Sequence, residues 1–553
     1  MRGSFLGLGL VLVCGCGGAD LMIGDGGDEG SNPMMEGGGG GDGGGDGGGD
    51  ACMSMPEICG DMVDNDCDGV VDNGCKMLGT YVSGATGVDT NPGTKALPVK
   101  TIAQGIKNAQ AIGGKLTVYV GNSHYSEKVT LVEGISLEGG YHCDMMTCDW
   151  MRNPGTYDSA ILNTDFGGVL APASITRATK IDGFRLQGMP GAAPNTGSAA
   201  ITVLGSPSIT GNRINGGDVS SGRTEGVDIL APIADPTGAL IENNDIQGGN
   251  VGSLGTVGIA FEFIPNAPPG STAAATVRIN RIKGGTGEFT SCINAWSSGA
   301  QTAILGNSLT GGNSPGGNNG TSSWGIQIFG TALIDSNLIN TDQSAVGGCA
   351  GVQWCGGINS FSSTSTITNN VIYGNKGPFS VAVFLQEAEK PAGVVILNGN
   401  FLDGAGVGLQ GNPTRSAGVA LRINGGANAL SLGRIRNNII QGGNNLQRFG
   451  IWEDQIANKT NKPNAMDTND FFFPTLANRV DVFWRQWNGT TITDVLVVPA
   501  NNIGGDPMVD NTWHLQNGSP CIDKGTATDA PAKDRDGNNR PMGQGFDIGA
   551  DEK

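Results

Sequence analysis

The chain has 553 residues, of which 96 are Gly and 25 are Pro, and 38% are hydrophobic. Gly and Pro at that level are typical of low-complexity segments, but the hydrophobic fraction still supplies a core, so we expect only part of the chain to be low in complexity. The 32 basic and 51 acidic residues give a net charge of -19, which would repel a phosphate backbone and argues against nucleic acid as a partner.

The N-terminus has the pattern of an export signal. Arg2 precedes the apolar run 5–13, and the small-residue stretch "VCGCGG" follows it. The run is too short to span a bilayer in the mature protein. The segment "VCGC", ending at Cys16, resembles a bacterial lipobox, which implies cleavage before Cys16 and lipidation of its side chain. Secretion with ordinary cleavage nearby stays an alternative, and Cys14 leaves the site ambiguous.

These features predict a lipoprotein signal peptide over residues 1–15. The mature protein would then be secreted through the general export route and held by its lipid at the outer membrane or cell surface of a Gram-negative bacterium. Residues 16–51 are rich in Gly and Asp, with few side chains to bury, and are expected to be a disordered tether. Cysteines beyond the signal are expected to form disulfides, because the chain leaves the cytoplasm.

Residues 52–76 form a short Cys-rich segment with a run of carboxylates. Oxygen ligands fall at positions 1, 3, 5, 7 and 9 of a calcium loop, and they come from Asp64, Asp66, Asp68, the carbonyl of Val70, and Asp72. Position 12 is Cys75 in place of the Glu of an EF-hand. The segment resembles the MopE-like Cys-rich metal-binding motif, which implies a structural Ca²⁺ ion. A knot of two disulfides among Cys52, Cys59, Cys67 and Cys75, with solvated Asp side chains, is the alternative.

One short phrase returns along residues 181–443, as "IENNDIQGG" at 241–249 and "IRNNIIQGG" at 435–443. Its second polar residue recurs about every 32 residues, at Asn212, Asn244, Asn280, Asn307, Asn337, Asn370, Asn400 and Asn438. Alternating aliphatic residues and Gly-rich corners surround each copy, without helical periodicity. The pattern predicts an all-β fold, a single-stranded right-handed parallel β-helix of the pectin-lyase type with about 12 coils, over residues 77–510.

The repeated Asn has a structural explanation. Equal positions in successive coils stack about 4.8 Å apart, so their amides can hydrogen-bond along the axis. A tight corner also needs a residue that tolerates left-handed dihedral angles, as Asn does. The phrase therefore predicts architecture rather than chemistry.

A second column runs through the strands near residues 293, 326 and 358. With Ile293, Ile326 and Ile358 facing inward, strand alternation turns two neighbouring sets outward. These sets are the amides Asn294, Gln327 and Asn359 and the rings Trp296, Phe329 and Phe361. Such rings beside amides could stack on sugar faces, so we consider a glycan-binding platform; the alternative is a stripe covered by a loop or tail.

The two ends carry the more specific resemblances. Residues 100–113 place Ile102, Ile106 and Ala109 on one helical face, which predicts a short N-terminal capping helix. The sequence from "YVSGATGVDTNPGTKALPVKTIAQGIKNA" onward resembles the opening domain of extracellular pectate-lyase-like β-helix proteins of unassigned activity. Residues 511–553, with "DRDGNNRP" and "FDIGADE", resemble a choice-of-anchor Q segment of surface β-helix proteins, and we expect them to close the solenoid.

Catalytic groups are sparse in this sequence. The best outward carboxylate pair is Asp228 with Glu262, on neighbouring coils and two residues out of register, hence roughly 8 Å apart. That separation would suit an inverting hydrolase, although solvated carboxylates are commoner. Spacing predicts disulfides Cys143–Cys148 and Cys349–Cys355, and it does not assign Cys292 or Cys521. No Cys pair has a matching His or Cys pair at zinc-ligand spacing.

The sequence thus favours a cell-surface or envelope lipoprotein that is structural or binds polysaccharide, without enzymatic activity. A polysaccharide lyase or glycoside hydrolase acting in a lateral groove is the second hypothesis. The oligomeric state has no sequence signal.

Overall fold

The computed structural model describes residues 79–553, apart from short gaps at 115, 163–167, 189–196, 220–221, 252–254, 265–266, 269–270, 315–321, 342–353, 362–363, 388–394, 407–413, 424–428 and 432. The predicted signal, tether and Cys-rich segment lie outside the described residues, and so do Cys16 and the predicted calcium ligands. Lys76–Lys553 forms one compact unit. None of the helices in the described part of the chain is long and apolar enough to cross a bilayer.

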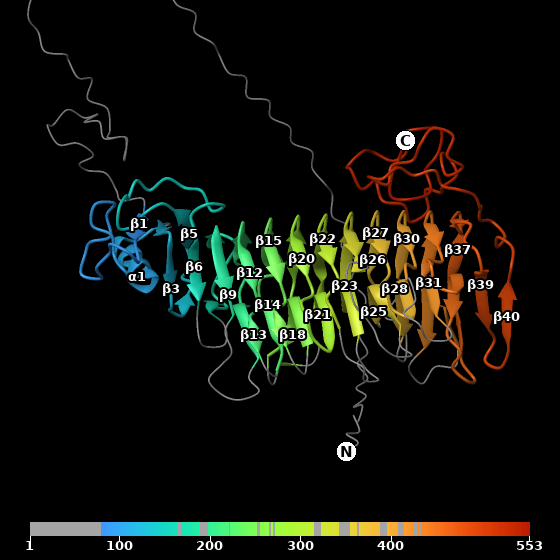
Figure 1. The fold of residues 1–553 in the computed structure, drawn as a ribbon, viewed down its shortest axis with the longest axis horizontal. Coiled ribbons are helices and arrows are strands. Elements are labelled where there is room, and N and C mark those ends of the chain that lie inside the picture. The colour runs from blue at the N-terminus through green and yellow to red at the C-terminus, as the bar shows by residue number, and fades with distance from the viewer. Residues whose placement is uncertain are drawn as a thin grey trace, which may run out of the picture. The chain divides into compact units, whose positions relative to one another are not determined.

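The unit is a parallel β-solenoid, as the repeat predicts (Figure 1). Each coil contributes one strand to each of three faces, here named A, B and C. Faces A and B are joined because β21 and β23 run without interruption through both. All strand pairings are parallel except β39 with β40, which is antiparallel and ends the stack.

The strands of face A are β4 (Val129–Thr130), β7 (Val169–Ala171), β10 (Ser198–Val203), β14 (Thr224–Ala231), β18 (Gly255–Phe263), β21 (Phe289–Leu305), β23 (Ser322–Asp335), β25 (Cys355–Phe361), β28 (Phe379–Glu387), β31 (Arg415–Ile423), β35 (Gln447–Glu453) and β39 (Val480–Trp487), followed by β40 (Ile492–Val495). Face B, besides β21 and β23, has β1 (Gly79–Val82), β2 (Leu116–Gly121), β5 (Ile135–Tyr141), β8 (Lys180–Asp182), β11 (Ser208–Thr210), β15 (Ala239–Glu242), β19 (Ala275–Arg278), β26 (Thr366–Thr368), β29 (Ile396–Asn398), β33 (Arg434–Arg436) and β37 (Ala465–Asp467).

Face C is a twelve-stranded sheet of β3 (Ser123–Tyr125), β6 (Ser159–Leu162), β9 (Phe184–Gln187), β12 (Arg213–Asn215), β16 (Asp245–Gln247), β20 (Arg281–Lys283), β22 (Ser308–Thr310), β24 (Leu338–Asn340), β27 (Val371–Tyr373), β30 (Phe401–Asp403), β34 (Ile439–Gln441) and β38 (Asp470–Phe472). Two small ribbons pair β13 (Asp218–Val219) with β17 (Asn250–Val251), and β32 (Ala429–Ser431) with β36 (Thr460–Lys462).

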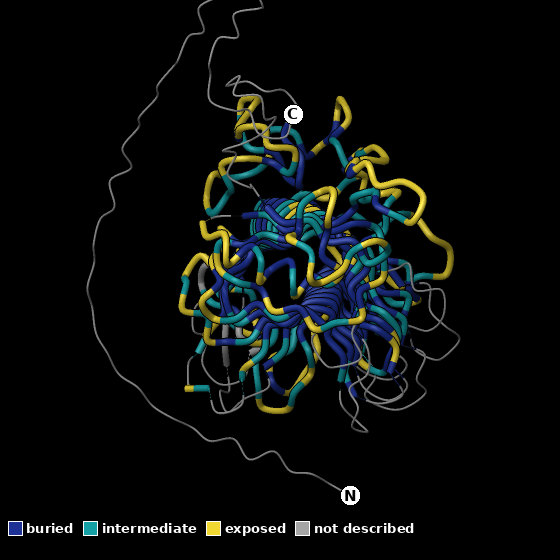
Figure 2. Tube along the Cα trace, turned by 90° about the vertical axis from the view of Figure 1, so that its left-hand side faces the viewer, coloured by how far each residue is buried: buried dark blue, intermediate teal, exposed yellow. Residues whose placement is uncertain are grey.

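Stacked aliphatic side chains fill the interior between the three faces. In face A, for example, Ile259, Ile293, Ile326 and Ile358 pair in register and are fully buried. Figure 2, which looks along the stack, shows these buried strands around one core. The inward orientation predicted for Ile293, Ile326 and Ile358 is therefore confirmed.

The N-terminal end is covered by helix α1 (Ile102–Ile112), as the sequence predicts. Thr101 caps the helix by accepting a hydrogen bond from the Gln104 backbone N–H. Its buried face consists of Ile102, Gly105, Ile106 and Ala109. This apolar face packs against β1 and β2 and protects the first strands of the stack from solvent.

The repeated Asn residues form a continuous ladder at the corner between faces B and C. At each step, the backbone N–H and the Nδ2 group of one Asn donate to Oδ1 of the next, at 2.9 and 3.1 Å for Asn212 and Asn244. We call this column the Asn ladder. It continues past the predicted Asn438 to Asn469 and Asn502, so that it runs through about nine turns.

The left-handed residue of this corner is not the ladder Asn, which corrects our explanation of the repeat. Positive φ occurs at the residue directly before it, namely at Gly183, Gly211, Asn243, Ile279, Gly306, Ser336, Asn369, Gly399, Asn437, Thr468 and Asn501. The recurrence of Asn at the ladder position is therefore explained by the hydrogen bonds of its side-chain amide. Ile279 and Thr468 are β-branched residues at φ 56° and 55°, a conformation that strains such residues, and Ile279 is also 60% exposed.

The C-terminal segment 511–553 packs against the flank of face C, whereas we expected it to close the end of the solenoid. Its Leu515 and Ile548 cover an apolar strip formed by Val371, Phe401 and Ile439. Figure 1 shows the segment in red above β27 and β30, away from β39 and β40 at the end of the stack. The register of face C explains this location. The outward position that is apolar at Val371, Phe401 and Ile439 is polar in earlier coils, as in Arg213, Asp245, Arg281 and Ser308.

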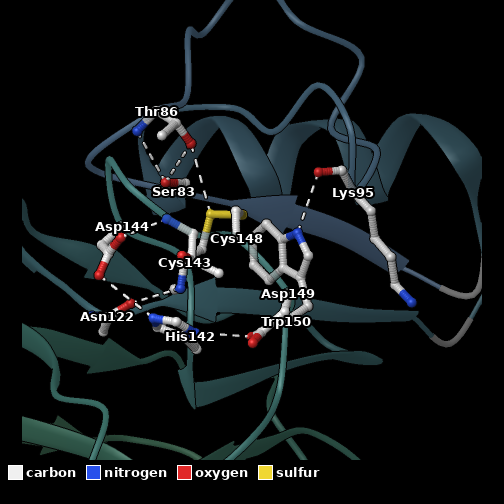
Figure 3. Close-up of a disulfide and its surroundings, with 12 residues drawn as sticks. Ser83, Thr86, Lys95, Asn122, His142, Cys143, Asp144, Cys148, Asp149 and Trp150 are labelled. Atoms are coloured by element: carbon white, nitrogen blue, oxygen red, sulfur yellow. Dashed lines mark hydrogen bonds and ion pairs between the residues drawn. A yellow bond between two sulfur atoms is a disulfide. The ribbon is translucent and has the colours of Figure 1, made fainter.

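The disulfide predicted from spacing, Cys143–Cys148, is present in a loop at the N-terminal end (Figure 3). The indole of Trp150 in the same loop donates a hydrogen bond to the Lys95 carbonyl at 3.2 Å. Cys355 is also disulfide-bonded, and its predicted partner Cys349 lies outside the described residues. Cys292 and Cys521 are buried free thiols, and burial raises the pKa of both.

Candidate functional site

A groove of about 590 Å³ lies on the outer surface of face A. Strands β14, β18, β21 and β23 and the residues next to them supply its walls. Arg223, Glu262, Phe263, Asn294, Trp296 and Gln327 are among the lining side chains. Aromatic, amide and charged groups therefore meet in one open cavity.

The predicted aromatic stripe borders this groove and is exposed. Trp296 is 52% and Phe329 is 39% exposed, while Phe361 is half-buried. Trp296 stacks on Phe329 with ring centroids 6.1 Å apart, and Phe329 stacks on Phe361 at 5.5 Å. The outward orientation is thus correct, and the residues that the structure describes leave Trp296 and Phe329 exposed.

The stacking changes what the stripe can offer to a ligand. Phe329 has a ring on both sides, so its faces are occupied. In the part of the chain that the structure describes, no ring stacks on the other side of Trp296, which borders the groove. The register of β21 with β23 shifts between Ala295 and Ser298, directly around Trp296. Of the three rings in the stripe, Trp296 is the one that lines the groove, and its outer face is available to a ligand there.

The predicted amides stack in register beside the rings. Asn294 pairs with Gln327, and Gln327 pairs with Asn359. Nε2 of Gln327 donates to Ser291 Oγ at 2.6 Å, and Oδ1 of Asn359 accepts from Gln386. Oδ1 of Asn294 is buried and has no hydrogen-bond partner among the described residues. It is therefore an acceptor that a ligand could use.

The carboxylates Asp228 and Glu262 are closer together than we predicted. Asp228 pairs with Ala260 and Glu262 with Leu230, so the predicted register is correct. However, carboxylate oxygens of both lie within 4.8 Å of each other and of Glu225, in place of the predicted 8 Å. The side chains lean toward one another, and the separation falls below the 6.5 Å or so that an inverting hydrolase needs.

Arg223 holds this group together. Its guanidinium donates to Glu225 at 3.2 Å and forms a second ion pair with Glu262. Asp228 is only 3% exposed, and its Oδ1 has no hydrogen-bond partner among the described residues. We name Arg223, Glu225, Asp228 and Glu262 the carboxylate cluster.

Burial and crowding shift the acidities in the carboxylate cluster. Desolvation, with the charge of Glu262 as the next cause, raises the pKa of Asp228 to about 7. The pKa of Glu225 is raised well above its ordinary value by burial and then by Asp228. The neighbouring carboxylates keep the pKa of Arg223 high in spite of its burial. Near neutral pH, the cluster therefore retains protons that ordinary carboxyl groups would have lost.

Sequence reasoning missed Arg223 and Glu225. Strand alternation places Arg223 and Glu225, two residues apart in "RTEGVD", on one face, but Glu225 and Asp228 are three residues apart, so alternation alone would not have brought them together. The predicted distance between Asp228 and Glu262 used backbone spacing alone. It did not take into account that Arg223 pairs with both Glu225 and Glu262.

Three carboxyl groups predict how stability depends on pH. Burial raises the pKa of Asp228, Glu453 and Asp470 each to about 7. Unfolded Asp and Glu titrate near pH 4, so their contribution to stability is complete below about pH 4 and is lost as the pH rises through 7. Calorimetry should show the melting temperature falling between pH 5 and pH 8. Asp470→Asn, which cannot ionise, should fall less steeply; an equal slope in both proteins would contradict this account.

The three His residues lie away from the groove. His514 contacts Asp536 at 2.9 Å, and Asp551 is close enough to complete a possible ligand set. However, Asp551 already accepts a hydrogen bond from the Leu515 backbone N–H at 2.7 Å. This group therefore serves to hold the C-terminal segment in shape.

No family model matches the chain, and no curated protein matches it in sequence. Among solved structures, it is similar to a lacto-N-biosidase from Eubacterium ramulus, at 13% identity over 77% of this chain and 67% of that one, with a TM-score of 0.35. It is also similar to XylC in complex with xylose, at 10% identity over 85% and 98%, with a TM-score of 0.40.

A third similar structure is an α-1,3-glucanase from Streptomyces thermodiastaticus, at 13% identity over 70% of this chain and 66% of that one, with a TM-score of 0.37. At these identities the likeness concerns the fold alone.

Proposed function

We propose that this protein binds a polysaccharide at the bacterial surface through the groove on face A. The observation that supports the proposal most directly is the open indole face of Trp296 in a cavity that also contains Asn294 and Gln327. A pyranose ring presents an apolar C–H face and a rim of hydroxyl groups. Trp296 suits the first, and the amides suit the second.

The chemistry of the groove supports a saccharide over an extended apolar ligand. The unpartnered Asn294 Oδ1 can accept from a sugar hydroxyl, and Glu262 and Arg223 line the same cavity. A lipid chain would leave Asn294 Oδ1 without a hydrogen bond, at a cost of about 1–3 kcal/mol, and would cover the charged Glu262 and Arg223 side chains.

Glycan-array binding followed by calorimetry tests the proposal. Trp296→Ala should weaken binding to any glycan found by about tenfold or more, because it removes the exposed indole that borders the groove. Trp487→Ala is a matched control, since Trp487 lies in β39, away from the groove. Equal effects of both substitutions, or no glycan bound at all, would reject the proposal.

The alternative function is a polysaccharide lyase or glycoside hydrolase in the same groove. It is favoured by the neighbouring carboxyls Asp228 and Glu262, whose environments differ, as they do in acid–base pairs. Each bound glycan should be incubated with the protein and assayed for reducing ends and unsaturated products. Turnover that is abolished by Asp228→Asn would replace binding with catalysis as the function.

For the N-terminal part, the sequence alone supports the proposals. Cys16 would carry the lipid, and Asp64, Asp66, Asp68, Val70 and Asp72 would hold a structural Ca²⁺ ion. Palmitate labelling that persists in Cys16→Ser would refute the anchor. Calorimetry at millimolar Ca²⁺, comparing the full chain with an Asp66→Asn, Asp68→Asn variant, tests the ion.

A further inference from the structure

We propose that Glu225, Asp228 and Glu262 form a binding site for a divalent cation that prefers oxygen ligands, such as Ca²⁺, in the wall of the groove. This site is separate from the calcium loop predicted at residues 64–75. It does not depend on the polysaccharide proposal, because an ion can bind there without any glycan.

The geometry of the three carboxylates is the first argument. One oxygen from each lies within 4.8 Å of the other two. Ca²⁺ binds oxygens at 2.3–2.6 Å, so two ligands on opposite sides of the ion are about 4.6 to 5.2 Å apart. Three oxygens that converge this closely can therefore share one ion after small side-chain rotations.

The second argument is the unpartnered oxygen of Asp228. This side chain is 3% exposed, and Oδ1 has no hydrogen-bond partner among the described residues. A buried polar atom without a partner costs about 1–3 kcal/mol, and fully buried acceptors of this kind are rare in folded proteins. A cation bound to the Asp228 carboxylate would give this buried group a partner.

The balance of charge is the third argument. Among the described residues, three acidic side chains face one basic side chain, Arg223, which pairs with Glu225 and Glu262 and not with Asp228. The four side chains together carry an excess of negative charge, which a divalent ion bound among the carboxylates would offset.

Arg223 has a defined part in this proposal. Its side chain is 38% exposed, so the guanidinium can turn outward into the groove when the ion arrives. Arg223 thus competes with the cation for Glu225 and Glu262. A purely structural ion-pair cluster would need Arg223 in place, whereas a cation site would bind its ion more tightly without it.

Terbium luminescence on the full chain tests the site, because Tb³⁺ replaces Ca²⁺ and is excited through a nearby indole. The measurements use a background with Asp66→Asn and Asp68→Asn to silence the predicted calcium loop. We expect a signal that Ca²⁺ displaces, with about one ion per chain, and that is reduced in Trp296→Phe, because Trp296 lines the same groove.

Two substitutions separate the proposal from a structural cluster. Asp228→Asn keeps the shape of the side chain and should weaken Ca²⁺ binding by at least about 10- to 100-fold. Arg223→Gln should tighten Ca²⁺ binding, and Ca²⁺ should restore any melting temperature that this variant loses. No displaceable signal at millimolar Ca²⁺, a signal unchanged in Asp228→Asn, or weaker binding in folded Arg223→Gln would each overturn the proposal. A glycan-binding defect alone would leave these readouts unchanged.

Discussion

Asn337→Ala is expected to lower the free energy of unfolding by about 3 kcal/mol, because it removes several buried hydrogen bonds at once. Nδ2 of Asn337 donates to the Ile304 carbonyl at 2.8 Å and to Asn370 Oδ1 at 2.9 Å. Its own Oδ1 accepts from the backbone N–H and from Nδ2 of Asn307, each at 2.9 Å. Alanine would leave the Asn307 backbone N–H and the Ile304 carbonyl unpaired inside the wall.

Chemical denaturation of Asn337→Ala and Asn215→Ala provides the measurement. Asn215 is a suitable control because its half-buried side chain accepts one hydrogen bond, from the Gly217 backbone N–H at 2.7 Å. We expect a loss of about 1 kcal/mol for the control. Equal losses in the two variants would mean that the Asn ladder adds nothing beyond an ordinary turn.

Glu552→Ala is expected to destabilise the docking of the C-terminal segment by about 3–5 kcal/mol, the cost of leaving a buried charge without its partner. The side chains of Arg540 and Glu552 are 1% and 0% exposed, and their charged atoms are 2.8 Å apart. Arg540 also donates to Asn369 Oδ1 in the solenoid, at 3.2 Å. The unpaired guanidinium would have to find water, and the segment would open to reach it.

Limited proteolysis combined with calorimetry would detect this opening. Cleavage within 511–553 should become much faster, while the solenoid stays resistant. Asp245→Ala is the control, because Asp245 pairs with Arg281 at 3.7 Å on an exposed surface, and its loss should cost less than about 1 kcal/mol. If Glu552→Ala is no more sensitive than Asp245→Ala, the pair does not hold the segment.

The repeat made the fold predictable from the sequence. Each coil has to offer the same hydrogen-bonding and packing positions to its neighbours, so Asn280 and Asn307 stack because their chain positions are equivalent. Strand alternation fixes which residues face inward, and the orientations of Ile293 and Trp296 follow from it. The helix at 102–112 was predictable from its apolar face.

The site was only partly predictable, because it depends on side-chain conformations that the strand register does not determine. Backbone spacing places Asp228 and Glu262 too far apart, and it does not show that Glu262, which pairs with Arg223, brings a carboxylate oxygen close to Asp228. Ring stacking likewise depends on rotamers, so the sequence predicted three outward rings without showing that Phe329 has both faces occupied. The docking of the C-terminal segment had a signal in Phe401 and Ile439, which replace polar residues on face C.

The Asn ladder also bears on how such a chain could change its length. Every step uses the same two donors and one acceptor, and Asn280 contacts Asn307 in the same way as Asn307 contacts Asn337. Deleting or duplicating the segment between one ladder Asn and the next would join two coils whose hydrogen-bonding positions already match. A solenoid built in this way can lose or gain whole coils by recombination, while α1 at one end and β39 with β40 at the other stay unchanged.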